Sequence, residues 1–264
     1  MSLHNDDRIE LQKPLKIKSR LTLLVVASII IGSAIFAEFS IFDLIFNLDE
    51  SLSLIGRLFF PPNWSYTTRI ISALLETFQM AILGTVFGGI IAIPLSVLAA
   101  SNFTVKYINV PVRLMLNFFR TIPALVLASL FVAFFDIGSF GGVMALSVFS
   151  FGLVSKLTYE SIESIDHGQV EALMSLGANK LTILRYAIVP QVLPQFMSYI
   201  LYALEVNVRA AAVLGYVGAG GIGQSYELNL SWRRFDKVGM IIIVSFAFVL
   251  IIDFISSSIR KRLV

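Results

Sequence analysis

The sequence contains no cysteine and only two histidines, and charged residues make up only 14% of it. Without cysteine the chain has no disulfide and no cysteine-ligated zinc or iron–sulfur site, and two isolated histidines do not make a histidine-rich metal centre. The sequence also lacks the G-x-x-x-x-G-K-[ST] loop that holds nucleotide phosphates. We therefore expect no metal and no cofactor in this chain, and no ATPase activity of its own.

Hydrophobic residues are abundant instead. They make up 57% of the 264 residues, against roughly 45–50% in ordinary soluble domains. A hydrocarbon core of about 30 Å is crossed by about 20 helical residues, so the chain has room for about six or seven spans. The composition predicts an all-α polytopic membrane protein, and basic residues at membrane ends account for the net charge of +3 without nucleic-acid binding. The apolar runs predict six helices: Leu21–Ala37, Ser72–Ala100, Leu114–Phe135, Phe140–Tyr159, Gln191–Leu214 and Val238–Ser256.

The first apolar run, Leu21–Ala37, has two interpretations. A basic leader precedes it, as in a secretory signal. However, Ile35-Phe36-Ala37 places a branched apolar residue where a signal peptidase needs a small one, and the run is longer than most signal cores. An uncleaved membrane anchor is therefore favoured.

The charge distribution predicts the orientation. With six spans and the N-terminus inside, most of the 20 basic residues fall on the cytoplasmic side, and both termini are cytoplasmic. Residues 38–69 are then external, and their apolar groups favour a helix along the bilayer surface. The expected organisation is an N-terminal anchor region over residues 1–71, a membrane core over residues 72–258, and a basic cytoplasmic tail over residues 259–264.

The segment between the fourth and fifth predicted spans, Ser161–Pro190, is too polar to cross a membrane. Asp166 is a suitable N-cap for a first short helix, and Gln169 three residues later completes a capping-box pattern. Gly177 is suited to the left-handed residue that ends this helix. Asn179 is then a suitable N-cap for a second helix.

The second helix is expected to run from Lys180 to about Val189, and Pro190 is expected to end it where the fifth span begins. It would present Leu181, Leu184 and Ile188 on one face. From periodicity alone, a connector lying on the bilayer surface explains this segment as well as a docking element does.

The spacing of Glu171-Ala172-Leu173, Gly177 and Pro190 resembles the EAA loop of permease subunits in binding-protein-dependent ABC importers. Leu173 departs from the pattern, because a second alanine is usual there. Further motifs resemble the permease of the phosphonate importer: Arg120-Thr121-Ile122-Pro123, Gln191-Val192-Leu193-Pro194-Gln195, the run 207–215 and the glycine-rich run 217–223.

This resemblance implies a type I ABC importer permease fold in the bacterial inner membrane, without enzymatic activity in this chain. It implies a homodimer that works with a dimeric ATP-binding subunit and an external phosphonate-binding protein. The substrate would be phosphonate, or phosphate, phosphite or another small oxyanion. The residues implied to contact the ATPase are Glu171, Ala172, Leu173, Gly177 and Pro190.

Candidate residues for the translocation path are Arg120, Asn207, Arg209 and Gly220, since polar groups at membrane depth tend to face a cavity or a partner. Arg120 could instead reach the cytoplasmic headgroups, and Arg209 could form a local i,i+4 ion pair with Glu205. The G-x-G-x-x-G pattern at 218–223 lacks the βαβ context of a dinucleotide site, so we interpret it as a tight turn. A stand-alone secondary transporter or channel for a small anion is the alternative function.

Overall fold

The computed structural model describes residues 17–37 and 46–263, and these form helices, turns and loops with no strand. The chain divides into two compact units, one up to Ile55 and one from Gly56 onward. The first unit contains α1 (Ile17–Phe36), and α3 (Leu48–Phe59) begins in it. The predicted anchor segment is therefore helical, and the predicted surface helix corresponds to α3. That α1 is retained as a span, and that the membrane core begins after residue 71, stay predictions.

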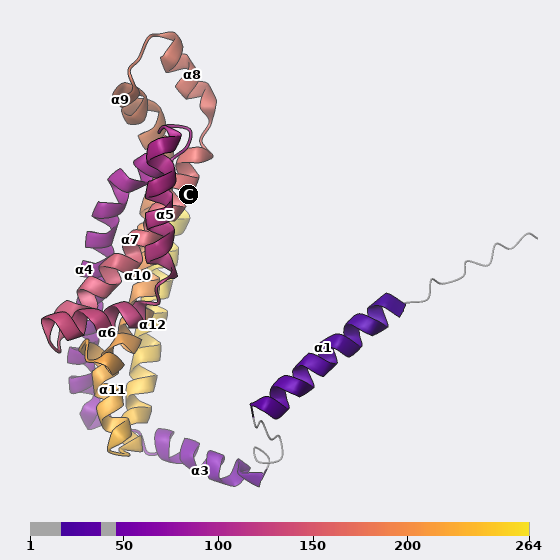
Figure 1. Ribbon diagram of the computed structural model, residues 1–264. Coiled ribbons are helices and arrows are strands. Elements are labelled where there is room, and N and C mark those ends of the chain that lie inside the picture. The colour runs from indigo at the N-terminus through magenta and orange to yellow at the C-terminus, as the bar shows by residue number, and fades with distance from the viewer. Residues whose placement is uncertain (1–16, 38–45, 264) are drawn as a thin grey trace, which may run out of the picture. The chain divides into compact units, whose positions relative to one another are not determined.

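Four helices of the second unit are long and apolar enough to cross a membrane. They contain α4 (Thr67–Ala99), α7 (Ser139–Glu163), α10 (Val189–Leu214) and α12 (Phe235–Leu263). These helices lie lengthwise beside one another (Figure 1). The all-α polytopic fold is confirmed, and each of the four helices contains or nearly matches its predicted range.

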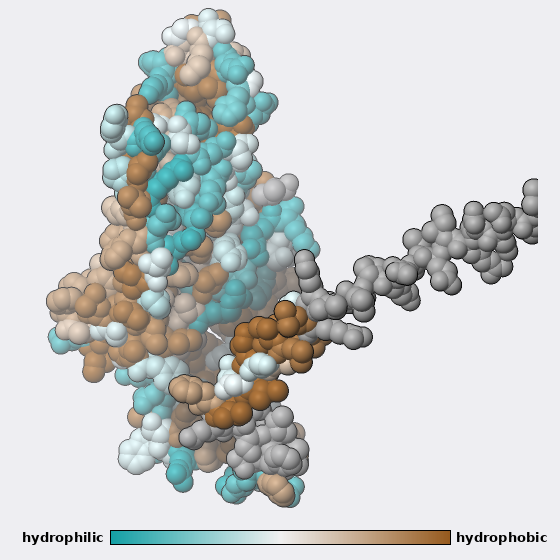
Figure 2. Space-filling view, turned by 45° about the vertical axis from the view of Figure 1, so that its right-hand side comes forward, coloured by the Kyte–Doolittle hydropathy of each residue, from teal (hydrophilic) through white to brown (hydrophobic). Residues whose placement is uncertain are grey.

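The predicted single helix Leu114–Phe135 is wrong, because the chain breaks there. α5 (Lys106–Thr121) and α6 (Ala124–Phe135) meet at an angle of 86°. Pro123 offers no N–H to continue the helix and disfavours helical backbone at the residue before it, so Ile122 is extended, with φ −79° and ψ 121°. α6 consequently lies across the long helices (Figure 1), at a height where apolar side chains dominate the visible surface (Figure 2).

The broken pair still completes one crossing. Beside the start of α7, the Gly138 N–H donates to the Gly218 carbonyl at 2.9 Å. At the other end of α7, Glu163 accepts from the Ser101 N–H, just after α4 ends. α4 and α7 therefore run in the same direction, so α5 and α6 together return the chain. The second unit therefore has five candidate crossing segments, and α1 is the candidate for a sixth.

Close contact between α4 and α7 forms the centre of the second unit. A Cβ at Gly84 would lie 2.5 Å from Leu146 Cβ, and one at Gly88 would lie 2.5 Å from the Ser147 carbonyl oxygen. These glycines are four residues apart, the spacing that lets membrane helices approach closely. Asn207 of α10 closes the same region: its amide donates to Thr85 Oγ1 at 2.8 Å and to Ser150 Oγ at 2.5 Å. Asn207 thus links three helices at a fully buried position.

The predicted helix end at Pro190 is also wrong. α9 (Lys180–Ile183) continues through a π-turn (Leu184–Ile188) directly into α10. A proline inside an α-helix leaves one carbonyl without its donor and clashes with it. The wider π-turn relaxes the backbone just before Pro190, so the helix passes through the proline without stopping. The second loop helix and the fifth span therefore form one continuous helix.

Candidate functional site

The most distinctive surface element is the loop between α7 and α10, which projects beyond one end of the bundle (Figure 1). We call that end the loop end. α8 (His167–Ser175) begins at Asp166, whose Oδ1 accepts the Gly168 N–H at 3.0 Å. It ends at Gly177, with φ +76°, where the Gly177 N–H donates to the Met174 carbonyl and the Ala178 N–H donates to the Leu173 carbonyl. This pair of bonds is a Schellman motif, so the predicted cap and glycine stop are confirmed.

The second loop helix begins as predicted. Asn179 Oδ1 accepts the Thr182 N–H at 2.8 Å. The predicted apolar face is partly wrong, because Leu181 is exposed while Ile183 is buried with Ile188. The buried face packs on a cluster of α5 and α7 side chains, including Leu116 and Tyr159. The π-turn shifts the helical phase, which periodicity at 3.6 residues per turn cannot anticipate.

The tip of the loop exposes apolar side chains. Leu176 is 83% exposed, and Met174 and Leu181 are also exposed. Apolar groups at such a tip mark a contact surface when they are surrounded by polar ones, and hydrophilic colour predominates around this end (Figure 2). Among the predicted contact residues, Glu171, Ala172, Gly177 and Pro190 are exposed, whereas Leu173 packs inward on the cluster at the loop base.

The two ends of the loop are joined by Gln191, a residue to which the sequence analysis assigned no role. We call the junction of Asp166 with Ala187 and Gln191 the neck of the loop. Gln191, one residue after Pro190, accepts the Asp166 N–H on Oε1 at 3.0 Å. Its Nε2 donates to the Ala187 carbonyl at 2.9 Å and lies 3.4 Å from acceptors on Asp166 and Gln169. The predicted capping box is therefore wrong, since Gln191 and not Gln169 takes the Asp166 N–H. Because the partners are 25 residues apart in sequence, no local pattern could have identified this bond.

A second set of contacts, like the Gln191 hydrogen bonds, acts as a tether and holds the start of the loop at the end of α7. Glu163, the last residue of α7, pairs with Arg113 of α5 and accepts from the backbone and hydroxyl of Ser101. Arg113 also donates through Nε to the Ala99 carbonyl at 2.7 Å and lies over the Tyr159 ring. These contacts connect the start of the loop to α4, α5 and α7.

Arg209 is engaged by two carboxylates. It lies 3.0 Å from Glu205 Oε1, so the predicted i,i+4 pair is confirmed, and 3.3 Å from Asp253 Oδ2 of α12. Arg260 binds the second Glu205 oxygen at 2.8 Å. Of the basic residues at the C-terminal end of α12, Arg260 pairs with Glu205, whereas Asp253 pairs with Arg209. The four charges neutralise one another, and the Arg209 side chain remains 46% exposed.

Arg120 differs from Arg209. It is exposed near the end of α5, two residues before the 86° break, and its side chain makes no ion pair or hydrogen bond within the described part of the chain. Gly152 of α7 packs against its backbone, where a Cβ would lie 3.4 Å from Arg120 Cα. Among the candidate cations for the path, Arg120 has the guanidinium left available for a ligand.

Gly220 lies at the opposite end of the bundle, in a turn between α10 and α11 (Gly221–Ser231). Its φ is +81°, and a Cβ there would lie 2.6 Å from Glu76 Oε1. Ser139 donates its hydroxyl to the Glu76 carboxylate, and Thr77 Oγ1 accepts the Ile222 N–H at 2.8 Å. Gly220 is therefore buried in a tight turn, as the sequence predicted, while its place on the translocation path stays a prediction.

Comparison with known proteins adds to this geometry. A model of the family described as "Binding-protein-dependent transport system inner membrane component" matches residues 92–264. The putative phosphite transport system permease protein HtxC of Stutzerimonas stutzeri is 39% identical over 202 residues, which are 76% of this chain and 72% of the relative. The phosphate-import permease protein PhnE of Mycolicibacterium smegmatis is 32% identical over 257 residues, which are 94% of this chain and 48% of the relative.

Solved structures share the fold. A chain of the MetNI methionine ABC transporter in an inward-facing conformation superposes with a TM-score of 0.68 at 22% identity, covering 76% of this chain and 99% of that one. A chain of a bacterial ABC transporter involved in the import of the acidic polysaccharide alginate gives a TM-score of 0.62 at 18% identity, covering 92% and 99%.

Proposed function

Since the chain belongs to the family of inner membrane components of binding-protein-dependent transport systems, we propose that its loop Asp166–Pro190 docks on a separate ATPase subunit and couples ATP hydrolysis to transport. The observation that carries this proposal is the capped, tethered loop with an apolar tip beyond the end of the bundle. An apolar, ordered projection needs a partner, and a chain without a phosphate loop needs an external source of energy.

The proposed substrate is phosphonate or a related phosphorus oxyanion such as phosphite or phosphate. The names of the relatives support this class, and the motifs that resemble the phosphonate permease agree with it. An external binding protein would deliver the anion, and two copies of the chain would meet around the path. The half-exposed charges on α10 and α12 support such an arrangement, because charges at membrane depth avoid lipid.

The proposed cycle is alternating access. Closure of the ATPase pair displaces the two loops, and the Gln191 and Glu163 tethers pass that displacement to the helices, which open the path toward the binding protein. The loop end then lies in the cytoplasm, as do both termini. A stand-alone transporter is less favoured, because the Glu205 and Asp253 carboxylates are already paired with arginines and are not free to bind a coupling ion.

The test is reconstitution of the purified chain in vesicles with its ATPase subunit and binding protein. We expect ATP-dependent uptake of labelled methylphosphonate, phosphite or phosphate that needs all three components, and co-purification of the ATPase with the membrane chain. Uptake by the chain alone, driven by an ion gradient, would contradict the proposal and favour the stand-alone transporter.

Arg120 gives a sharper prediction about the path. A guanidinium offers planar paired donors to phosphorus oxyanions, and among the described residues no carboxylate pairs with this one. We expect Arg120→Gln to lower uptake about fivefold, equivalent to about 1 kcal/mol for a water-exposed charged hydrogen bond. Arg120→Lys should recover part of the loss, and Lys106→Gln, an exposed cation on the same helix, should have no effect. Full uptake by Arg120→Gln would remove Arg120 from the path.

A further inference from the structure

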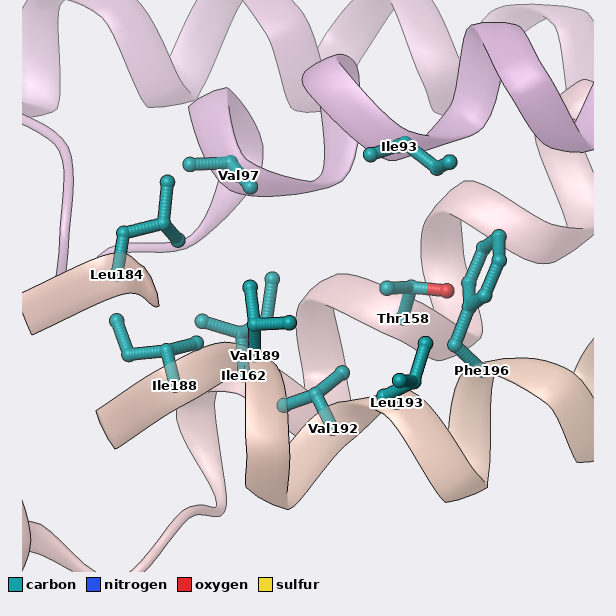
Figure 3. A pocket seen from close by; sticks show the side chains of 10 residues that line it. All are labelled: Ile93, Val97, Thr158, Ile162, Leu184, Ile188, Val189, Val192, Leu193 and Phe196. Carbon is teal, nitrogen blue, oxygen red and sulfur yellow. The ribbon is translucent and has the colours of Figure 1, made fainter. Parts of the chain in front are cut away.

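A cavity of about 240 Å³ lies between α4, α7 and the junction of the π-turn with α10 (Figure 3). Nine of its ten lining side chains are hydrocarbon, and the tenth is Thr158. The floor is buried and includes Ile162, Ile188 and Val192, whereas the rim residues Ile93, Val189 and Leu193 are about half exposed. Apolar cavities of about 150 Å³ bind apolar groups, so this larger apolar pocket, open on one side, is suited to hydrocarbon.

Thr158 adds one specific polar contact. Its side chain is 5% exposed, and its hydroxyl has no hydrogen-bond partner within the described part of the chain. Other buried hydroxyls of these helices, such as those of Thr77 and Thr85, donate to the carbonyl four residues earlier. Figure 3 shows the Thr158 oxygen directed toward Phe196, another residue of the lining. The cavity therefore offers a single buried donor in an apolar surrounding, which favours an apolar ligand with one acceptor oxygen.

The mouth of the cavity opens away from the charged surface. Along α10, Leu193 and Arg209 are 16 residues apart, which separates their side chains by about 160° around the helix axis. The charged side chains that α10 shares with α12 thus lie on one side of α10, and the rim of the cavity lies on the other side. On that second side the rim residue Ile93 continues an exposed apolar stripe of α4 that includes Val86 and Ile90. A stripe of apolar side chains without charges is the surface that contacts bilayer lipid.

The depth of the cavity fits one part of a lipid. Thr158 lies five residues, or about 7.5 Å along the helix axis, before the end of α7. The charged pair Arg113–Glu163 marks a polar level at the end of α7, and about 5–10 Å below such a level lies the boundary between lipid headgroups and acyl chains. We propose that the cavity binds an acyl chain of a bilayer phospholipid and that the Thr158 hydroxyl donates to the ester carbonyl at the head of that chain. The site lies against Leu184 and Ile188 of the π-turn, directly below the loop. The proposal does not depend on the transported substrate.

Photolabelling of the full chain tests the proposal. The chain is reconstituted in phosphatidylethanolamine and phosphatidylglycerol vesicles with a trace of phosphatidylglycerol that carries a diazirine in its acyl chain, and adducts are mapped by mass spectrometry. Bulk lipid reaches only exposed side chains. A chain lodged in the cavity also labels the buried floor, at Ile162 and Val192. Adducts confined to exposed positions such as Ile90 would overturn the proposal.

Three variants sharpen the result. Leu193→Trp, at a half-exposed position that tolerates a larger ring, should block the mouth and abolish the floor adducts, whereas Ile90→Trp on the same surface should leave them unchanged. Thr158→Val keeps the shape and removes the donor, so it should lower the floor adducts while adducts at Ile90 persist. Equal floor labelling in Thr158→Val would overturn the assigned hydrogen bond.

A second copy of the chain is another possible occupant of the mouth. Because the sequence contains no cysteine, Leu193→Cys introduces a single thiol. We expect this thiol to react with a lipid-soluble maleimide and to form no disulfide between two chains. A disulfide-linked dimer would show that protein and not lipid covers the mouth.

Discussion

Replacing Gly177 by valine is expected to remove most ATP-driven uptake while leaving the chain inserted in the membrane. Gly177 has φ +76°, and a Cβ at this position would meet no atom within 4 Å. The penalty for a side chain is therefore conformational and not steric crowding. Left-handed backbone costs a β-branched residue about 2 kcal/mol, which reduces the population of the native turn roughly 30-fold. Uptake and substrate-stimulated ATP hydrolysis in vesicles measure the effect.

Asparagine at the same position is the matched control. It tolerates left-handed backbone better than other residues with a side chain, so Gly177→Asn should retain most of the uptake. Both substitutions add a side chain to the same open position, so a difference between them reports the backbone turn alone. Normal uptake and normal ATP hydrolysis by Gly177→Val would show that the loop is not the ATPase contact.

Gln191→Leu is expected to separate ATP hydrolysis from uptake. The substitution removes the hydrogen bonds to Asp166 and Ala187 that close the neck, while a side chain of similar length remains. Two such bonds contribute about 1–3 kcal/mol together. The capped tip is untouched, so ATPase docking and hydrolysis should persist. The uptake per ATP hydrolysed should fall about tenfold, because displacement of α8 no longer reaches α10 through the neck.

The chain supplies a close control for this variant. Gln195 lies one turn further along α10 and makes no side-chain hydrogen bond within the described part of the chain. Gln195→Leu should therefore leave the ratio of uptake to hydrolysis unchanged. Gln191→Glu keeps the acceptor for the Asp166 N–H but loses both donors, so it should give an intermediate ratio. If Gly177→Val abolishes uptake and Gln191→Leu does not change the ratio, the loop couples to the ATPase without the neck.

Local chemistry accounts for the loop features that were predicted correctly. Asp166 and Asn179 cap helices because their short acceptors reach backbone N–H groups two or three residues ahead, and Gly177 stops a helix because its backbone accepts positive φ. These interactions span only a few residues, so residue type and spacing determine them. The apolar runs likewise predicted the long helices, since about 20 apolar residues match the bilayer thickness.

The missed hydrogen bonds and ion pairs share one cause, which is that their partners are distant in sequence. Gln191 and not Gln169 accepts the Asp166 N–H, and Arg260 joins Arg209 as a second partner of Glu205. The Arg113–Glu163 pair joins residues 50 positions apart. Such contacts form only after helices pack, and a single sequence does not show which of several compatible partners will lie nearest.

Composition and motif spacing are enough to show that the chain is a polytopic helical membrane protein, where its loop helices are capped, and which family it resembles. All of these follow from hydrophobicity, short-range hydrogen bonding and motif spacing. Only the three-dimensional structure shows that Pro123 breaks a span while the helix continues through Pro190, although both are prolines in apolar helical runs. A proline removes the same backbone donor in both places, but the wider π-turn before Pro190 relaxes the backbone so that the helix continues, whereas the extended Ile122 before Pro123 ends it.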